Sequence, residues 1–172
     1  MNSIKVKNIC DVIVETHPYH LKLKEKLIQD SKEAEYFPLG DTPAQCLHSS
    51  YKTSTPTIKL LHRWMNELIK EMHGIKRPVE FLDTWFLVYK KGHHTPKHAH
   101  FPSCLSFVYF VQCPKGSSPL IFSDSGKRIK AEEGKVVIFP SCMYHEVPKC
   151  HCDDRITLSG NAFDAQAGFS HY

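Results

Sequence analysis

Four of the chain's twelve histidines lie within the eight residues from His93 to His100, immediately before an apolar run. Imidazole ligates first-row metals and also titrates near neutrality, so the cluster could be a metal site, an acid/base pair or a solvated loop. His98 and His100 are two residues apart, and in an extended chain both side chains would leave the same face. His145 lies about 45 residues further on, after the buried strand predicted at 135–140. Two antiparallel strands inside a barrel would bring these three histidines together.

A charged residue, Arg155, follows the histidine group at a position that could be buried, where an unpaired charge costs free energy. Arg155 opens the last predicted strand, ten residues after His145. If its side chain points into a barrel, it is an isolated buried charge unless an anion pairs with it. Thr157 is two residues further along and therefore lies on the same strand face. We therefore predict that an acidic group binds beside Arg155.

Other conspicuous residues have simpler interpretations. His93 and His94 follow Gly92 in a predicted loop, so we expect them to face solvent or to line a substrate site rather than to bind metal. Trp64 and Trp85 lie within predicted elements and are assigned to the core.

The region 1–80 is predicted to supply one or two short strands and two helices. Residues 1–15 alternate enough in polarity for the strands, and residues 17–34 have the spacing of a helix whose apolar face consists of Leu21, Leu27 and Ile28. A second helix is expected to begin at Thr55 and Pro56, an N-cap and first-turn pair, and to end at Gly74. Its apolar stripe consists of Ile58, Leu61, Met65, Leu68 and Met72.

After Pro78 the pattern changes to short apolar runs separated by Gly, Pro, Ser and Asp, at 81–92, 104–116, 118–124, 135–140 and 155–163. Such runs indicate an antiparallel sandwich or barrel. We expect a mainly β chain of the α+β class, with the helices packed on one outer face of the barrel. Its 172 residues suit one domain, with the N-terminal strand and supporting helices in 1–80 and the β core in 81–165.

Composition argues against several function classes. The net charge of +4 comes from basic residues spread along the chain, which gives no reason to expect a nucleic-acid partner. No segment approaches the roughly 20 apolar residues of a membrane span, and the N-terminus lacks the apolar core of a signal peptide, so we expect a cytoplasmic protein.

The seven cysteines have no repeating spacing and are expected to be reduced thiols. Cys150, His151 and Cys152 lie close together and not far from Cys142 in the sequence. Structural zinc normally uses two ligand pairs, and no second pair exists here. We therefore predict a polar loop rather than a zinc site.

Four segments, "WFLVYKKG", "HAHFPSCLSFVYFV", "EGKVVIFPSCMYH" and "RITLSGNAF", occur in an order and at separations that resemble the iron(II)- and 2-oxoglutarate-dependent oxygenases. The likeness is greatest to the compact phage and bacterial branch related to prolyl hydroxylases. It runs from Trp85 to Phe163, whereas residues 1–80 match only in their helical character. The resemblance implies a distorted double-stranded β-helix, which is the jelly-roll barrel of the cupin superfold.

The resemblance also implies roles for the residues singled out above. His98 and His145 would occupy the two histidine positions of the metal motif and bind Fe(II). Arg155 would hold the distal carboxylate of 2-oxoglutarate, helped by Thr157 at the serine position of the family's R-x-S pattern. The metal ligands and this arginine would be the catalytic residues.

Two tyrosines of the predicted strands, Tyr89 and Tyr109, are candidates to reach the cosubstrate from the barrel wall, although aromatic residues in strands usually belong to the core. The enzyme implied is a dioxygenase that uses dioxygen and 2-oxoglutarate to hydroxylate a substrate. Kinship with prolyl hydroxylases suggests that the substrate is a protein or peptide side chain, and a small molecule is also open.

The third metal ligand departs from the family pattern. The common facial triad is two histidines and a carboxylate, written H-x-D in this superfamily, and His100 stands where the aspartate is expected. Three alternatives follow: His100 is a ligand, His100 only hydrogen-bonds near the ion while water fills the third position, or Asp124 supplies the carboxylate. We favour ligation by His100.

Two functions of other classes compete with this interpretation. A three-histidine cupin-type dioxygenase would use iron without 2-oxoglutarate, and it fits "GHHTPKHAH" followed by "GKVVIFPSCMYH" almost as well. Arg155 argues against it. A non-catalytic jelly-roll binding module would need no metal at all.

Overall fold

The structure is a computed structural model that describes residues 3–6, 10–73 and 79–164. No helix within these ranges is both long enough and apolar enough to cross a membrane. The predicted helix end at Gly74 lies outside the described residues, as does the side chain of Met72.

The larger of two antiparallel sheets has seven strands, and the N-terminal region supplies β1 and β2 at one edge and β3 at the other. The strand order is β1 (Ser3–Val6), β2 (Cys10–Thr16), β9 (Lys135–Pro140), β6 (Leu105–Gln112), β11 (Arg155–Asp164), β4 (Val79–Tyr89) and β3 (Leu47–His48). Pairing of β2 with β9 and of β3 with β4 makes the first eighty residues part of the sheet itself. The two short N-terminal strands predicted at 1–15 are confirmed as β1 and β2.

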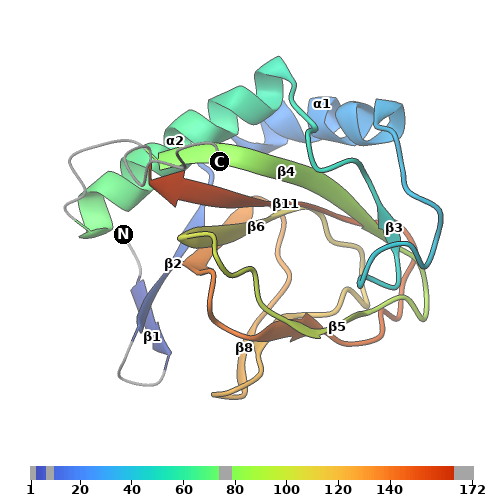
Figure 1. Ribbon diagram of the computed structural model, residues 1–172. Coiled ribbons are helices and arrows are strands. Elements are labelled where there is room, and N and C mark those ends of the chain that lie inside the picture. The colour runs from blue at the N-terminus through green and yellow to red at the C-terminus, as the bar shows by residue number, and fades with distance from the viewer. Residues whose placement is uncertain (1–2, 7–9, 74–78, 165–172) are drawn as a thin grey trace, which may run out of the picture.

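A four-stranded sheet faces one side of the large sheet (Figure 1). Its order is β5 (Thr95–His98), β10 (His145–Val147), β7 (Leu120–Phe122) and β8 (Lys127–Ile129). Side chains of both sheets form a buried core cluster between them, including Leu87, Val108, Phe122, Phe139 and Val147. The predicted mainly β class with antiparallel sheets is confirmed, and closure of the strands into a barrel stays a prediction.

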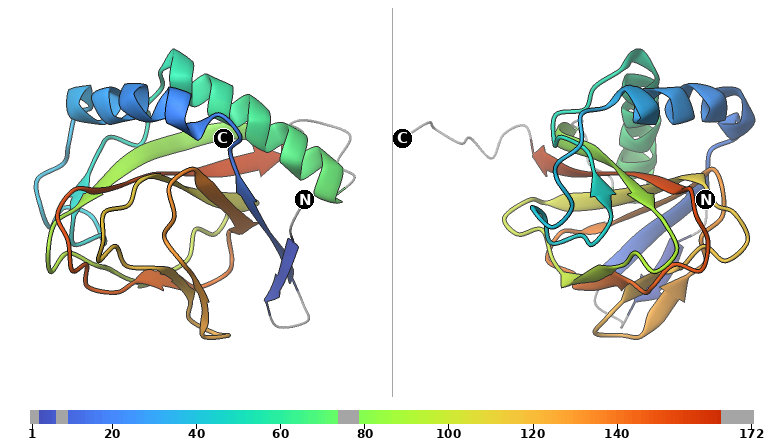
Figure 2. Two further views of the ribbon diagram at one scale, coloured as in Figure 1. Left: turned by 180° about the vertical axis from the view of Figure 1, so that it is seen from behind. Right: turned by 90° about the vertical axis from the view of Figure 1, so that its right-hand side faces the viewer.

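Two helices, α1 (His20–Glu33) and α2 (Pro56–His73), cover the opposite face of the large sheet (Figures 1 and 2). The predicted start of α2 is confirmed, because the Ile58 N–H donates to the Thr55 hydroxyl oxygen at 3.2 Å. The Thr55 hydroxyl also donates to Asp30 of α1 at 2.7 Å. One threonine therefore caps α2 and links the two helices.

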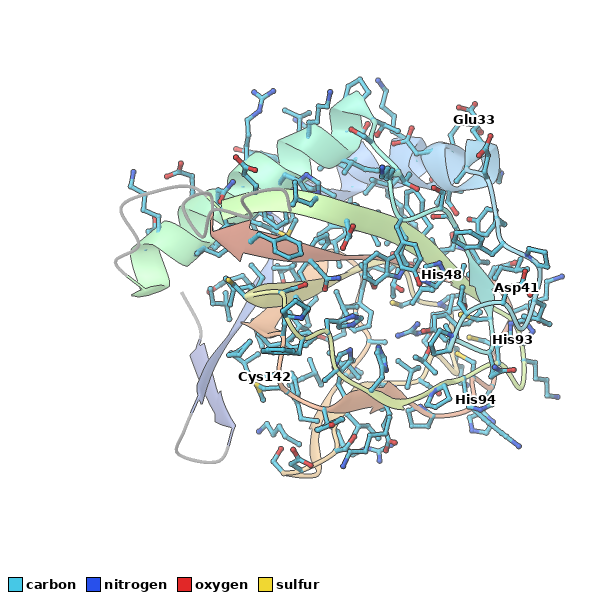
Figure 3. The ribbon with its side chains drawn as sticks, in the orientation of Figure 1. Glu33, Asp41, His48, His93, His94 and Cys142 are labelled. Atoms are coloured by element: carbon cyan, nitrogen blue, oxygen red, sulfur yellow. The ribbon has the colours of Figure 1, made fainter. Side chains whose placement is uncertain are left out.

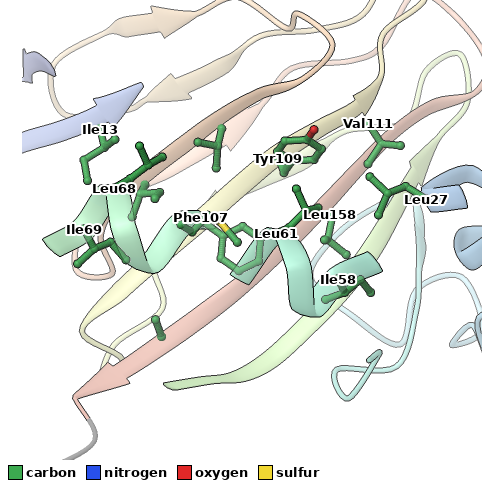
Figure 4. Close-up of a cluster of buried hydrophobic side chains, with 14 of the residues drawn as sticks. Ile13, Leu27, Ile58, Leu61, Leu68, Ile69, Phe107, Tyr109, Val111 and Leu158 are labelled. Atoms are coloured by element: carbon green, nitrogen blue, oxygen red, sulfur yellow. The ribbon is translucent and has the colours of Figure 1, made fainter. Parts of the chain in front are cut away.

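The helices bury a second apolar cluster against the sheet (Figure 4). It contains the stripe predicted for α2 as far as Leu68, together with Leu27 of α1. The prediction for Leu21 is wrong, since this side chain is 81% exposed. The buried face of α1 follows His20, Leu27 and Ser31, and Leu21 is rotated roughly 100° away from His20.

Six cysteines whose side chains the structure describes are free thiols: Cys46, Cys104, Cys113, Cys142, Cys150 and Cys152. The Cys150 N–H donates to the His93 carbonyl at 2.8 Å, so Cys150 lies beside His93. Cys142 lies well away from His93 and His94 in Figure 3. The sequence proximity of Cys142 to Cys150 and Cys152 is therefore not a spatial one, and no metal group containing a cysteine occurs among the described residues.

Candidate metal and cosubstrate site

The alternation of side chains along β11 and β4 builds one wall of a cavity between the two sheets. Arg155, Thr157 and Ser159 point into it, while Ile156 and Leu158 pack under the helices. Arg155 is paired with Tyr89 in register, Thr157 with Leu87 and Ser159 with Trp85, so β4 presents its cavity-facing residues beside those of β11. The cavity has a volume of about 190 Å³.

Three histidines line the same cavity from the opposite sheet. His145 of β10 pairs directly with His98 of β5. His100 follows two residues after β5, and its backbone N–H donates to the Ser141 carbonyl at 2.8 Å, which anchors this segment next to the one leading into β10. One ring nitrogen of each histidine lies within 4.8 Å of those of the other two. The structure thus brings together the three histidines singled out from the sequence.

Hydrogen bonds orient two of these rings. The Nδ1 atom of His98 is bonded to the Pro96 carbonyl at 2.8 Å, and that of His145 to the Met143 carbonyl at 3.0 Å. A carbonyl oxygen only accepts, so both Nδ1 atoms carry the proton and both Nε2 atoms keep a free lone pair. Metal-ligating histidines are typically held by such bonds.

Burial keeps the three rings uncharged. Burial, and to a smaller extent the neighbouring His98 and His100, lower the pKa of His145 to about 3. Burial likewise lowers the pKa of His100 to about 4, and that of His98 falls for the same reason. Neutral imidazole is the form that ligates a metal ion. The donor set fits a first-row divalent cation at neutral pH without prior loss of a proton.

The carboxylate alternative is set aside by the position of Asp124. Its side chain is 55% exposed and pairs with Lys97 at 3.1 Å, and it is not part of the histidine group. No aspartate or glutamate is found among the described residues that line the cavity. His93 and His94 also lie outside the group and do not line the cavity; Figure 3 shows them together near Asp41.

Arg155 is the unusual residue of the cavity. It is fully buried, and its Nε, Nη1 and Nη2 atoms have no hydrogen-bond partner in the described structure. Its guanidinium carbon lies 4.4 Å from the ring centre of Tyr89 and 5.5 Å from that of Phe110. Aromatic rings do not satisfy its five N–H groups, and buried polar groups are normally hydrogen-bonded. An anion in the cavity would supply the missing acceptors.

The two candidate tyrosines lie on different faces of the large sheet. Tyr89 lines the cavity, and its hydroxyl is hydrogen-bonded to that of Thr95 at 2.7 Å. Tyr109 packs under the helices (Figure 4), where its hydroxyl is bonded to His20 at 2.8 Å. The expectation that Tyr109 reaches a cosubstrate is corrected, because alternation along β6 turns Val108 and not Tyr109 toward the cavity.

Solved structures with a similar arrangement of strands and helices include 2OG-Fe(II) oxygenases. A viral collagen prolyl hydroxylase from Paramecium bursaria Chlorella virus-1, solved as a 2OG complex, is 13% identical over 87% of this chain and 94% of its own, with a TM-score of 0.67. A 2OG-Fe(II) oxygenase family oxidoreductase from Burkholderia pseudomallei is 10% identical over 88% and 84%, with a TM-score of 0.70. The chain has the fold of the 2OG-Fe(II) oxygenases.

A third structure with this oxygenase fold is HygX from Streptomyces hygroscopicus, solved with nickel, 2-oxoglutarate and hygromycin B bound. It is 10% identical over 90% of this chain and 83% of its own, with a TM-score of 0.66. No protein-family model matches the sequence, and a search of curated proteins finds no match. At these identities the likeness rests on the fold.

Among the cavity-lining residues that sequence reasoning did not select as site residues are Trp85, His48 and Tyr51. Trp85, assigned to the core, lies with its ring centre 5.7 Å from that of His100. His48 and Tyr51 come from the segment before α2. Burial lowers the pKa of His48, so this ring is also neutral. No spacing or motif in the sequence connects the segment containing His48 with the histidine cluster, and only its pairing with β4 does so.

Proposed function

We propose that this chain is an iron(II)- and 2-oxoglutarate-dependent dioxygenase that hydroxylates a protein or peptide side chain. One observation carries the proposal: a fully buried arginine without hydrogen-bond partners lines the same cavity as three neutral imidazoles. A metal ion at one end of the cavity and an acid at the other would satisfy both groups. 2-Oxoglutarate has the carboxylates needed to span them.

The residues divide into metal-binding and cosubstrate-binding sets. His98, His100 and His145 would hold the iron through ring nitrogens. Arg155 would bind the distal carboxylate through two parallel charge-assisted hydrogen bonds, a geometry that the planar guanidinium favours. Thr157 lies on the same strand face as Arg155, and its hydroxyl would bind the same carboxylate.

Tyr89 and its neighbours would orient the cosubstrate and keep water out. The Tyr89 ring lies against the guanidinium, and its hydroxyl is held by Thr95. Leu87, Leu120 and Val147 complete an apolar lining that lowers the local dielectric and strengthens the carboxylate–arginine pair. Dioxygen would be the oxidant: with iron and 2-oxoglutarate bound, one of its oxygen atoms would hydroxylate a C–H bond of the substrate and the other would enter succinate, with release of carbon dioxide.

The proposal is tested by anaerobic titration with Fe(II) and 2-oxoglutarate, which gives a visible charge-transfer band when the cosubstrate chelates the metal. Replacing Arg155 by alanine should leave iron binding intact, because the histidines hold the metal. Loss of one partner of a buried ion pair costs about 3–5 kcal/mol, which weakens 2-oxoglutarate binding by roughly a hundredfold or more. We therefore expect Arg155→Ala to lose both the band and succinate formation.

Arg128 of β8 provides a matched control, since it is exposed and does not line the cavity. Arg128→Ala should titrate like the wild type. Succinate formation by Arg155→Ala at the wild-type rate would refute the 2-oxoglutarate assignment.

A three-histidine dioxygenase that acts without 2-oxoglutarate is the second candidate. The observation that favours it is the absence of any carboxylate among the described cavity-lining residues, which leaves histidine alone as the donor. Such an enzyme would consume dioxygen with its substrate and form no succinate. A non-catalytic binding module would bind no iron, and metal analysis of the purified protein separates it from both enzymes.

The proposed substrate class is supported only by the similarity of this chain to solved structures. A collagen prolyl hydroxylase acts on a protein, and HygX was solved with hygromycin B, which is a small molecule. We favour a protein or peptide side chain because of the prolyl-hydroxylase neighbours. Oxygen-consumption assays against peptide mixtures and against small metabolites would decide between the two classes.

A further inference from the structure

Three aromatic side chains form a continuous wall beside the proposed metal position. The His48 ring is stacked on Trp85, with the ring centres 5.5 Å apart and the planes 11° apart. Tyr51 meets Trp85 edge to face at 5.2 Å and His48 at 4.7 Å. All three residues line the cavity, and Trp85 is the one that touches His100. We call these three residues the aromatic wall.

The aromatic wall leads from the metal position to the surface. Trp85 is 4% exposed, whereas Tyr51 is 39% exposed. Phe37, which is 36% exposed, extends the row outward by contacts with Tyr51 at 5.8 Å and with His48 at 5.9 Å. Arg155 is on the same sheet as Trp85 but pairs with Tyr89, four residues further along β4, so an acid bound between Arg155 and the metal would leave the aromatic wall uncovered. A second molecule can therefore approach the metal along these rings.

The charges of the site decide what kind of group can approach. With the three histidines neutral, a divalent metal contributes +2 and Arg155 contributes +1, and 2-oxoglutarate offsets two of these charges. One positive charge remains, whereas a carboxylate at the third ligand position would have cancelled it. No acidic residue is found among the described lining residues. A cationic substrate group would meet unscreened repulsion at short range in a buried site.

The remaining positive charge would attract an anion toward the metal, but no charged side chain of the aromatic wall would pair with it. Arg155, the only charged side chain among the described lining residues at neutral pH, is already paired with the cosubstrate. The faces that remain are aromatic rings, which favour apolar contact and repel anions through their negative faces. Uncharged apolar groups are thus the class that the wall accepts best.

Resting on the proposed function, we propose that the aromatic wall of His48, Tyr51 and Trp85 is the substrate subsite, and that it selects an uncharged apolar side chain over a cationic or anionic one. Tyr51 and Trp85 act here as specificity-determining residues. Their role is separate from metal binding by the three histidines and from carboxylate binding by Arg155.

Paramagnetic NMR tests the subsite without requiring turnover. The protein is loaded with Mn(II) and 2-oxoglutarate, and the probes are the N-acetyl methylamides of leucine, lysine and glutamate at equal concentration. Broadening of the side-chain proton lines reports approach to the metal. We expect the leucine probe to be broadened at least about fivefold more strongly than the lysine probe, and the glutamate probe to fall below leucine as well.

Variants test whether the broadening of the leucine probe depends on the aromatic wall. Tyr51→Ala and Trp85→Leu should lose most of the leucine broadening. Tyr51→Phe should keep it, because the aromatic ring alone makes the apolar contact. Tyr19 is a matched control: it is a 61% exposed tyrosine just before α1 and does not line the cavity. Tyr19→Ala should behave as the wild type. Water-proton relaxation measures Mn(II) binding in every variant, so a folding defect would be seen directly.

The outcomes separate this inference from the function on which it rests. If Mn(II) or 2-oxoglutarate does not bind before any probe is added, the proposed function fails and the inference falls with it. If both bind, the inference alone is overturned by any of three results: lysine broadened as strongly as leucine, no probe broadened, or leucine broadening unchanged in Tyr51→Ala and Trp85→Leu.

Discussion

At the scale of single residues, the third ligand position sets this site apart from a triad of two histidines and a carboxylate. His100 occupies a position from which its ring nitrogen lies within 4.8 Å of those of His98 and His145. His100→Asp should keep one equivalent of metal, because a carboxylate is an equally good ligand for a divalent ion. His100→Ala should bind metal at least about tenfold more weakly. Calorimetric titration with Mn(II) measures both.

His94 offers a control on the same loop, since it lies outside the histidine group. His94→Ala should bind Mn(II) like the wild type. Equal affinity in the wild type and in His100→Ala would show that His100 is not a ligand.

The two tyrosines provide a second test at this scale. Tyr89→Phe removes the hydroxyl bonded to Thr95 and keeps the ring against Arg155. On the proposed function the same hydroxyl would also hydrogen-bond the cosubstrate; loss of that bond costs about 1 kcal/mol, so 2-oxoglutarate should bind roughly fivefold more weakly. Tyr109→Phe, on the helix-covered face, should leave this affinity unchanged. Titration of the charge-transfer band measures the affinity for 2-oxoglutarate in both variants. An equal loss of affinity in the two would contradict the assignment of Tyr89 and Tyr109 to different faces of the sheet.

At the scale of elements, the position of α2 depends on one threonine. Thr55 caps the helix through the Ile58 N–H and bonds Asp30 of α1. Thr55→Ala should lower the free energy of unfolding by about 1–2 kcal/mol, since it removes a helix cap and a link between helices. Urea denaturation measures the change.

Asp30→Ala removes only the link between the helices and leaves the cap of α2. It should therefore cost less than Thr55→Ala. The same loss from both substitutions would show that the cap itself contributes nothing, and that only the contact between α1 and α2 matters.

At the scale of the whole molecule, buried histidines couple stability to pH. Burial lowers the pKa of His62 to about 4, and His17, His20 and His48 shift in the same direction for the same reason. Between the unfolded value near 6.5 and these lower values, the unfolded chain binds protons that the folded chain does not. Stability is therefore greatest above pH 6.5 and falls as the pH drops toward 4, by at most about 1.4 kcal/mol per pH unit for each group.

Urea unfolding of the metal-free protein at pH 7, 6 and 5 tests this slope. His62 packs against Phe81 and Phe107 and does not itself line the cavity, so His62→Gln should flatten the slope and leave the metal ligands in place. A slope that is unchanged in His62→Gln would show that this histidine does not titrate on unfolding.

The sequence by itself determined the elements and the chemistry-bearing positions within them. The two-residue spacings predicted that His98 and His100 leave one face of the chain and that Thr157 shares a strand face with Arg155, because alternation along an extended chain is a local property. The N-cap at Thr55 is local in the same way. Both depend on neighbours in the chain, so no knowledge of the packing was needed.

Only the tertiary structure decided which elements face one another. Both faces of β6 are buried, so the alternation of its side chains carries no difference in polarity, and nothing in the sequence shows that Tyr109 faces the helices. The sequence leaves open whether Asp124 joins the histidines, and in the structure it pairs with Lys97 and lies outside the histidine group. His48 and Tyr51 reach the cavity because β3 pairs with β4, a contact between residues far apart in the chain. Periodicity predicts the face of an element, and packing between distant elements decides what that face contacts.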